Sequence, residues 1–185
     1  TLIGGRIIPS FTRNWLARQS PGRLPIAFGP FDLACLVLGA LAAACWIVYP
    51  HALATAGLAA LAGVSHALRL ARWAGHRTTG EPLVLVLHFG YAFVPIGFLL
   101  LTLAIVAPDL VVASGALHAW TVGAIGTMSL AVMTRATLGH TGKALIASRS
   151  TQFIYVAIVI AALARILTGF DIWRNTLLTI SATAW

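Results

Sequence analysis

Long apolar runs separated by short polar segments dominate this chain. Five runs have about the 17 to 25 residues that a helix needs to cross a bilayer, and they cover residues 31–49, 52–68, 82–107, 110–134 and 152–167. A sixth run begins near Ile172 and reaches Trp185 after too few residues to cross. The pattern predicts an all-α fold, a polytopic transmembrane helix bundle with five full spans and a truncated sixth.

The two ends of the chain suggest a fragment of a longer protein. The chain starts at Thr1 without a Met, and four arginines precede the first apolar run. We expect one membrane-embedded helical region over residues 1–185. In it, residues 1–30 form a cytoplasmic lead-in after a preceding helix, and residues 31–185 hold the transmembrane helices.

Composition and charge agree with a membrane protein. Hydrophobic residues make up 59% of the chain, charged residues 9%, and the mean hydropathy is +0.93, which excludes a soluble domain. Most of the Lys and Arg residues behind the net charge of +8 fall in segments on one side of the predicted spans. Short cytoplasmic loops are enriched in these residues, so the basic side should be cytoplasmic. Because the charges are dispersed among helices of lipid length, we expect the bilayer and no nucleic acid as a partner.

Histidines are the main candidates for chemistry. An ionisable side chain inside a membrane is costly, and imidazole is a common metal ligand, so an intramembrane His suggests a functional site. The candidates are His66, His88, His118 and His140. A buried His can also simply hydrogen-bond a backbone carbonyl, and His51 and His76 fit interfacial or loop positions.

The predicted depths allow two sites. His66 and His88 come near the cytoplasmic ends of neighbouring spans and could hold a haem iron between them at equal depth. His140 lies in the predicted loop after the fourth span and could fold back onto that pair. His118 starts its span from the other face.

The carboxylates are placed differently. Asp32, Glu81, Asp109 and Asp171 all fall at span ends, so we expect no buried carboxylate for a proton relay or a cation site. This expectation disfavours a proton-coupled permease.

Small residues mark the fourth span as central. Gly115, Ala119, Gly123 and Thr127 recur at four-residue spacing, a pattern that lets helix backbones approach closely. Cys35 and Cys45 are about 15 Å apart along one helix, too far for a disulfide. They are best interpreted as packing residues, with soft copper ligands as the alternative.

The segment RATLGHTGK, residues 135–143, combines a glycine-flanked turn with positive charge. It could hold a haem propionate or another anion. It lacks the spacing of a Walker A loop, since Lys143 is followed by Ala144.

Four segments carry a family resemblance. Along the chain these are GGRIIPSFTRN (4–14), RLARWAGHRT (69–78), EPLVLVLHFGYAFVPIG (81–97) and HAWTVGAIGTMSLAVMTRATLGHTGK (118–143). In this order they resemble segments of the NnrS family of haem- and copper-containing bacterial membrane proteins. Family members are about twice as long, so the chain is similar to the C-terminal half, and the N-terminal half of the same protein would be its partner. The resemblance implies an inner-membrane protein linked to nitric oxide, nitrosative stress and denitrification.

The resemblance also assigns residues. It implies haem and copper as cofactors, His88, His118 and His140 as metal ligands, and Arg135, Arg13 and Tyr91 as cofactor-binding residues. His66 and His51 match no family motif. Phe89, Tyr91, Phe93 and Trp120 could wall a water-poor pocket, or they could be ordinary packing residues.

Two other functions stay possible. The chain could be a polytopic transporter of a metal complex or a small anion, or a structural subunit in which no single His matters.

Overall fold

The computed structural model describes residues 1–19, 21–170 and 174–185, and all regular secondary structure in these residues is helical. The longer helices are α1 (Gly4–Leu16), α2 (Pro30–Val48), α3 (Leu53–Ala71), α4 (Pro82–Val106), α6 (Thr127–His140), α7 (Arg149–Leu167) and α8 (Arg174–Ala184). Short elements are the 3-10 helices η1 (Gly75–Arg77) and η3 (Thr168–Phe170), α5 (Ser114–His118) and the π-helix η2 (Ala119–Gly126).

The five predicted spans are confirmed. Five helical segments among the described residues are long and apolar enough to cross a membrane, and α5, η2 and α6 together form one of them, Ser114–His140. This span ends later than the predicted 110–134 because the helix continues to His140, after which Gly142 takes a φ of +67°. His140 therefore lies in the last turn of a helix, and its predicted place in a loop is wrong. The predicted start of the sixth run at Ile172 lies outside the described residues.

Local sequence signals explain where the spans begin. Pro30 and Pro82 occupy the first turns of α2 and α4, where a missing N–H costs nothing. At α2 the Asp32 carboxylate accepts the Gly29 N–H at 3.1 Å, and at α7 Ser148 Oγ accepts the Thr151 N–H at 3.1 Å. These caps fix the entry of the chain into each span.

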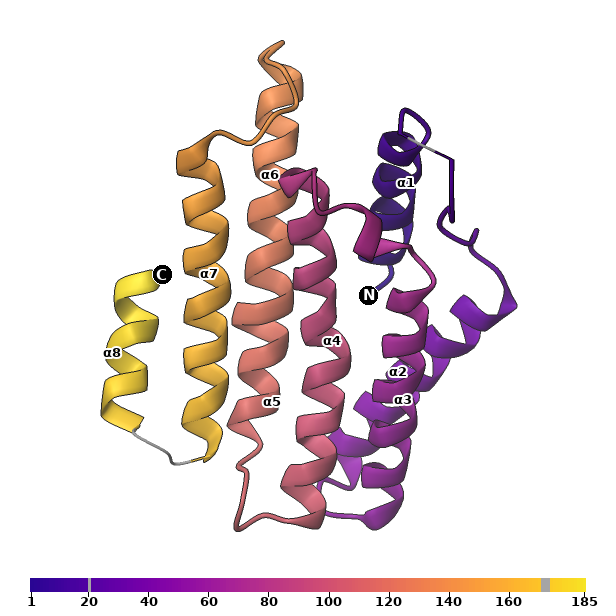
Figure 1. Ribbon diagram of the computed structural model, residues 1–185. Coiled ribbons are helices and arrows are strands. Elements are labelled where there is room, and N and C mark those ends of the chain that lie inside the picture. Colours follow the sequence, from indigo (N-terminus) through magenta and orange to yellow (C-terminus); the bar gives the residue numbers. More distant parts are fainter. Residues whose placement is uncertain (20, 171–173) are drawn as a thin grey trace.

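The spans pack as an antiparallel series in which sequence neighbours lie side by side (Figure 1). Helix α4 is central, with α3 on one side and the α5–η2–α6 span on the other, and α7 and then α8 lie beyond that span. The helix α1 lies at the end of the bundle where α4 begins. This end carries the basic loops between α3 and α4 and between α6 and α7.

Helix α1 occupies the segment that the sequence assigned to a lead-in. Its buried face begins with the adjacent Gly4 and Gly5 and continues at three- to four-residue spacing through Ile8, Thr12 and Leu16. Arg6, Arg13 and Asn14 are exposed. This is the pattern of an amphipathic helix with one face on the bundle. The charges of residues 1–30 predict only a lead-in, whereas the periodicity of residues 4–16 indicates this helix.

The fourth span, expected to be central from its small residues, lies between α4 and α7. Gly115 faces α7 and η3, where a Cβ would be 3.5 Å from the Ile166 carbonyl oxygen, whereas Gly123 faces α4. Gly115, Ala119, Gly123 and Thr127 are all buried. A Cβ on Gly123 would collide with the ring of Phe93. Gly123 therefore sets how closely this span approaches α4.

This close approach gives a first prediction. Gly123→Ala should lower the free energy of unfolding by about 1–3 kcal/mol, because the added methyl group overpacks the contact with Phe93. Thermal unfolding in detergent measures the change. Gly57→Ala in α3 is the matched control, since nothing lies within 4 Å of a Cβ there. Equal stability of the two variants would contradict the assigned packing.

Candidate functional site

His88 lies on the inner face of α4 and is 7% exposed. Its Nδ1 is 3.1 Å from the Val84 carbonyl oxygen, and its Nε2 is 3.4 Å from Thr12 Oγ1 on α1. The ring also packs so closely on Gly75 that a Cβ there would be 2.5 Å from it. Three elements, α1, α4 and η1, therefore position this imidazole.

The hydrogen bonds around His88 leave one nitrogen without a donor. The Thr12 hydroxyl donates to the Ile8 carbonyl oxygen at 2.8 Å, so it presents lone pairs to His88 Nε2. The Val84 carbonyl oxygen is also an acceptor, and a neutral imidazole has only one N–H. The Trp73 backbone carbonyl oxygen is a further acceptor beside the ring. With the proton on Nδ1, none of these acceptors uses the Nε2 lone pair. A metal-bound His has this arrangement, because its other nitrogen donates to a carbonyl or carboxylate.

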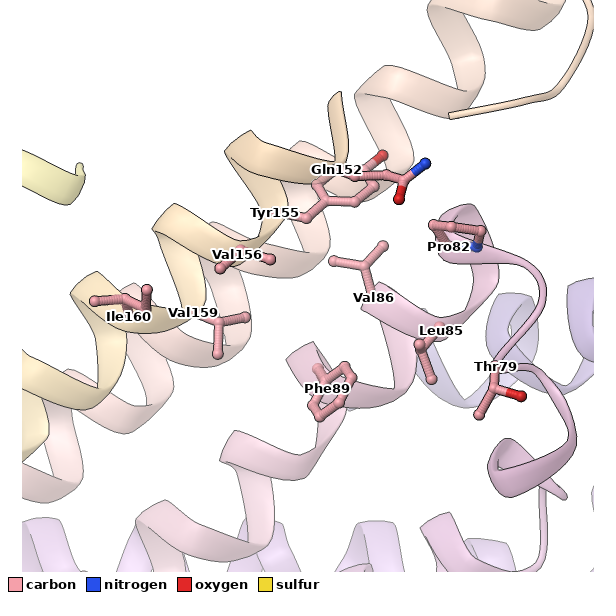
Figure 2. Close-up of a pocket in the computed structure, with 10 residues that line it drawn as sticks. All are labelled: Thr79, Pro82, Leu85, Val86, Phe89, Gln152, Tyr155, Val156, Val159 and Ile160. Carbon is pink, nitrogen blue, oxygen red and sulfur yellow. The ribbon is translucent and has the colours of Figure 1, made fainter. Parts of the chain in front are cut away.

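His88 borders a hollow of about 490 Å³ between the end of α3, η1 and the start of α4. Phe89, Arg23 and His76 line the same hollow. Phe89 is 52% exposed and also lines a second, apolar hollow of about 360 Å³ between α4 and α7. Figure 2 shows Phe89 there opposite Val159, with Gln152 and Tyr155 near one end. Of the four aromatic residues predicted to wall a pocket, Phe89 lines the hollow beside His88. Tyr91, Phe93 and Trp120 are not among the residues that line it.

His140 and Arg135 share a different hollow. Both line a space of about 400 Å³ together with Gly139 and Phe11, and the Arg135 guanidinium lies 4.3 Å from the centre of the Phe11 ring. The predicted cofactor residue Arg13 is exposed and donates to the Pro25 carbonyl oxygen at 2.6 Å. Helix α1 therefore contacts both places, with Thr12 at His88 and Phe11 at Arg135.

His118 lies at the opposite end of the bundle. Its Nδ1 is 3.1 Å from the Arg165 carbonyl oxygen of α7, and the side chain is half-buried. The predicted metal ligands thus fall in three places. No group of three or more His, Cys, Asp or Glu residues among the described residues is close enough to hold a metal ion.

A buried polar network that the sequence did not predict lies between α2, α3 and α4. Arg69 Nε donates to Asp32 Oδ1 at 2.9 Å, and Arg69 Nη1 donates to the Tyr91 hydroxyl at 2.9 Å. The same hydroxyl is 2.8 Å from His66 Nδ1. The side chains of Arg69 and Asp32 are 0% and 4% exposed. The predicted cofactor residue Tyr91 is therefore a junction between a buried ion pair and a buried imidazole.

This network corrects three expectations. Asp32 is buried in an ion pair, so the expected absence of a buried carboxylate is wrong; Asp171 lies outside the described residues. Arg69, one residue beyond the predicted span 52–68, is buried in α3, which continues to Ala71. His66 bonds to Tyr91 and stacks on Phe98 with ring centres 5.8 Å apart, while His88 contacts α1 and η1. The expected pair of His66 and His88 at equal depth therefore does not form.

A periodic signal for these residues is present in the sequence. In α3 the buried face runs through Ala59, Ala62 and Gly63 to His66 and Arg69 at three- and four-residue spacing. In α2 the buried face begins with Asp32 and continues through Cys35 and Gly39. The charged residues at the ends of these spans thus continue the buried faces of the helices. Cys35 and Cys45 are free thiols, and Cys35 packs against the Ser65 carbonyl oxygen at 3.5 Å.

The buried ion pair generates the second prediction. Asp32→Asn leaves the Arg69 guanidinium buried without its counter-charge and should lower the free energy of unfolding by about 3–5 kcal/mol. Unfolding by a denaturing detergent in mixed micelles measures the loss.

Two further variants isolate the pair. Asp109→Asn removes an exposed carboxylate and should have little effect. The double variant Asp32→Asn and Arg69→Gln should cost less than the sum of the single changes, because each single change leaves one charge uncompensated. Additive losses would contradict the assigned coupling.

The comparisons with known proteins agree with the arrangement of spans and motifs described above. No curated protein and no solved structure matches the chain. A family model described as "NnrS protein" matches residues 1–185, the whole sequence. The chain is thus a multi-pass membrane protein, with five helices in its described part that are able to span the bilayer, and it belongs to the NnrS family.

Proposed function

We propose that this protein binds haem or copper in the membrane and acts in the response to nitric oxide, with His88 as a metal ligand. The observation that carries the proposal is the setting of His88. The imidazole is buried, its Nδ1 faces a carbonyl oxygen, and its Nε2 faces a hydroxyl group whose proton is already donated elsewhere. The hollow beside it is within the range of about 300–1,000 Å³ typical of small-molecule sites.

The surrounding residues suit a small, nearly apolar ligand. A bound haem or copper centre supplies the open coordination position at which nitric oxide binds. Nitric oxide can enter from lipid without a polar channel, and the exposed ring of Phe89 faces the hollows on that side of α4. The chain's own part is to hold the His88 ring in one orientation and to wall the space with apolar groups.

The other predicted residues take supporting positions in this proposal. His118 Nδ1 faces the Arg165 carbonyl oxygen, which leaves Nε2 for a second centre near the other face. Arg135 and His140 line one hollow with Phe11, where a guanidinium group suits a haem propionate or another anion. Arg13 adds positive charge on α1. Because the three histidines lie apart, we propose that the N-terminal half of the protein supplies further ligands.

The proposed location is the bacterial inner membrane with the basic loops in the cytoplasm. The end of the bundle where α3 and α6 finish carries Arg72, Arg77, Lys143 and Arg149. An excess of Lys and Arg in short loops is typical of the cytoplasmic side.

A transporter of a metal complex or a small anion is the second candidate. The buried Asp32–Arg69 pair favours it, because ionisable groups inside a membrane often mark ion or proton pathways. The expected absence of such a carboxylate had counted against this function. Transport that persists after all bound cofactor is lost would distinguish it from the first proposal.

The third prediction tests the cofactor directly. The full-length protein, expressed with haem and copper supplied, should carry a haem absorption band or bound copper. His88→Ala should reduce the occupancy of that cofactor at least tenfold. Loss of an outer-shell partner lowers metal affinity about 10- to 100-fold, and loss of a ligand should lower it at least as much. Optical spectra and metal analysis measure the occupancy, and His118→Ala and His140→Ala test the other assigned ligands.

His51→Ala is the matched control, since His51 is exposed between α2 and α3. It should leave the spectrum and the metal content unchanged. A folded parent that carries neither haem nor copper would refute the proposal and favour the transporter.

A further inference from the structure

His66 is a buried imidazole with one anchored nitrogen and one nitrogen without a partner. The residue is 1% exposed, and its Nε2 has no hydrogen-bond partner among the described residues. Sequence motifs assign no role to it. His66 lies on α3, and the buried imidazole of His88 on α4 has polar neighbours at both nitrogens. Buried polar atoms are normally hydrogen-bonded, so ordinary packing does not explain the unpartnered Nε2 of His66.

His66 lines an apolar cavity of about 370 Å³ between α2, α4 and the η2–α6 span. Phe98, Trp120 and Met128 also line this cavity. A stacked contact with Phe98, at an interplanar angle of 1°, holds the imidazole plane. Met128 brings a thioether, a soft ligand of the kind that copper(I) prefers.

The anchored nitrogen belongs to a chain of oriented groups. His66 Nδ1 is 2.8 Å from the Tyr91 hydroxyl, whose oxygen accepts a hydrogen bond from Arg69 Nη1. Arg69 in turn is paired with Asp32. Metal-binding histidines characteristically have such outer partners, which fix the ring and its tautomer. When Nδ1 carries the proton and donates it to Tyr91, the Nε2 lone pair is available to the cavity.

The edge of the His66 ring that carries Nε2 faces a glycine, which has no side chain to obstruct it. Gly39 on α2 lies beside it, and a Cβ at this position would be 3.0 Å from His66 Nε2. A substitution at Gly39 therefore obstructs the nitrogen while leaving His66 and Tyr91 in place.

We propose that His66 Nε2 is a ligand to a transition-metal centre, either a copper ion or a haem iron, in the cavity between α2, α4 and η2. The Asp32–Arg69–Tyr91 chain orients this ligand. The inference rests on the proposed cofactor function and adds to it a binding residue outside the family motifs. A copper ion and a haem iron both bind an imidazole nitrogen, and their absorption spectra distinguish them.

The test compares four variants of the full-length protein, purified from membranes with copper and haem supplied. Gly39→Ala and Tyr91→Phe should each weaken binding of one metal about 10- to 100-fold, because the first obstructs Nε2 and the second removes the outer partner. His66→Gly should lose that metal, and added imidazole should restore it by occupying the vacated space. Gly57→Ala, on α3 with nothing within 4 Å of its Cβ, should match the parent.

Copper and iron content per chain, together with the haem absorption and copper resonance spectra, identify the metal, and thermal unfolding verifies that each variant is folded. Unchanged metal content, affinity and spectra in folded Gly39→Ala and His66→Gly would overturn this inference. If His88→Ala still loses its cofactor, the proposed function stands without His66. A parent with neither metal overturns both.

Discussion

The buried ion pair between Asp32 and Arg69 is the constraint around which the first half of the bundle is arranged. Charges inside a bilayer are tolerated only when they are paired and hydrogen-bonded. Arg69 meets this requirement through a carboxylate on α2, a hydroxyl on α4 and the ring of Trp73, 5.3 Å from its guanidinium carbon. Three helices must therefore keep a fixed register. Through Tyr91, the same register sets the position of the His66 ring.

Helix α1 closes this arrangement at the basic end of the bundle. Gly5 lies directly against the Arg69 guanidinium, where a Cβ would collide. One face of α1 thus covers the ion pair, while Thr12 reaches His88 and Phe11 stacks on Arg135. Helix α1 therefore contacts three candidate sites, namely the ion pair, His88 and Arg135. Its amphipathic pattern serves contacts with protein, and its arginines remain exposed.

The histidines of this chain differ in how their nitrogens are used. His88 and His118 each place Nδ1 against a backbone carbonyl oxygen, while His66 places it against Tyr91. An imidazole with one fixed nitrogen presents the other in a defined direction. His51, His76 and His140 are exposed and lack such an anchor in any described contact. Burial with an anchored nitrogen therefore sets His66, His88 and His118 apart from the other three histidines.

The sequence by itself determined the class of fold, because only helices satisfy their own backbone in lipid and the apolar runs have the length to span it. It also determined the close contact at Gly123 and the family, since both depend on local spacing and ordered motifs. Only the tertiary structure decided that Asp32, Arg69, Tyr91 and His66 form one network, because their partners come from different helices. The position of a charge along the chain marks the end of a span. Whether that charge meets water, lipid or a counter-charge depends on the neighbouring helices.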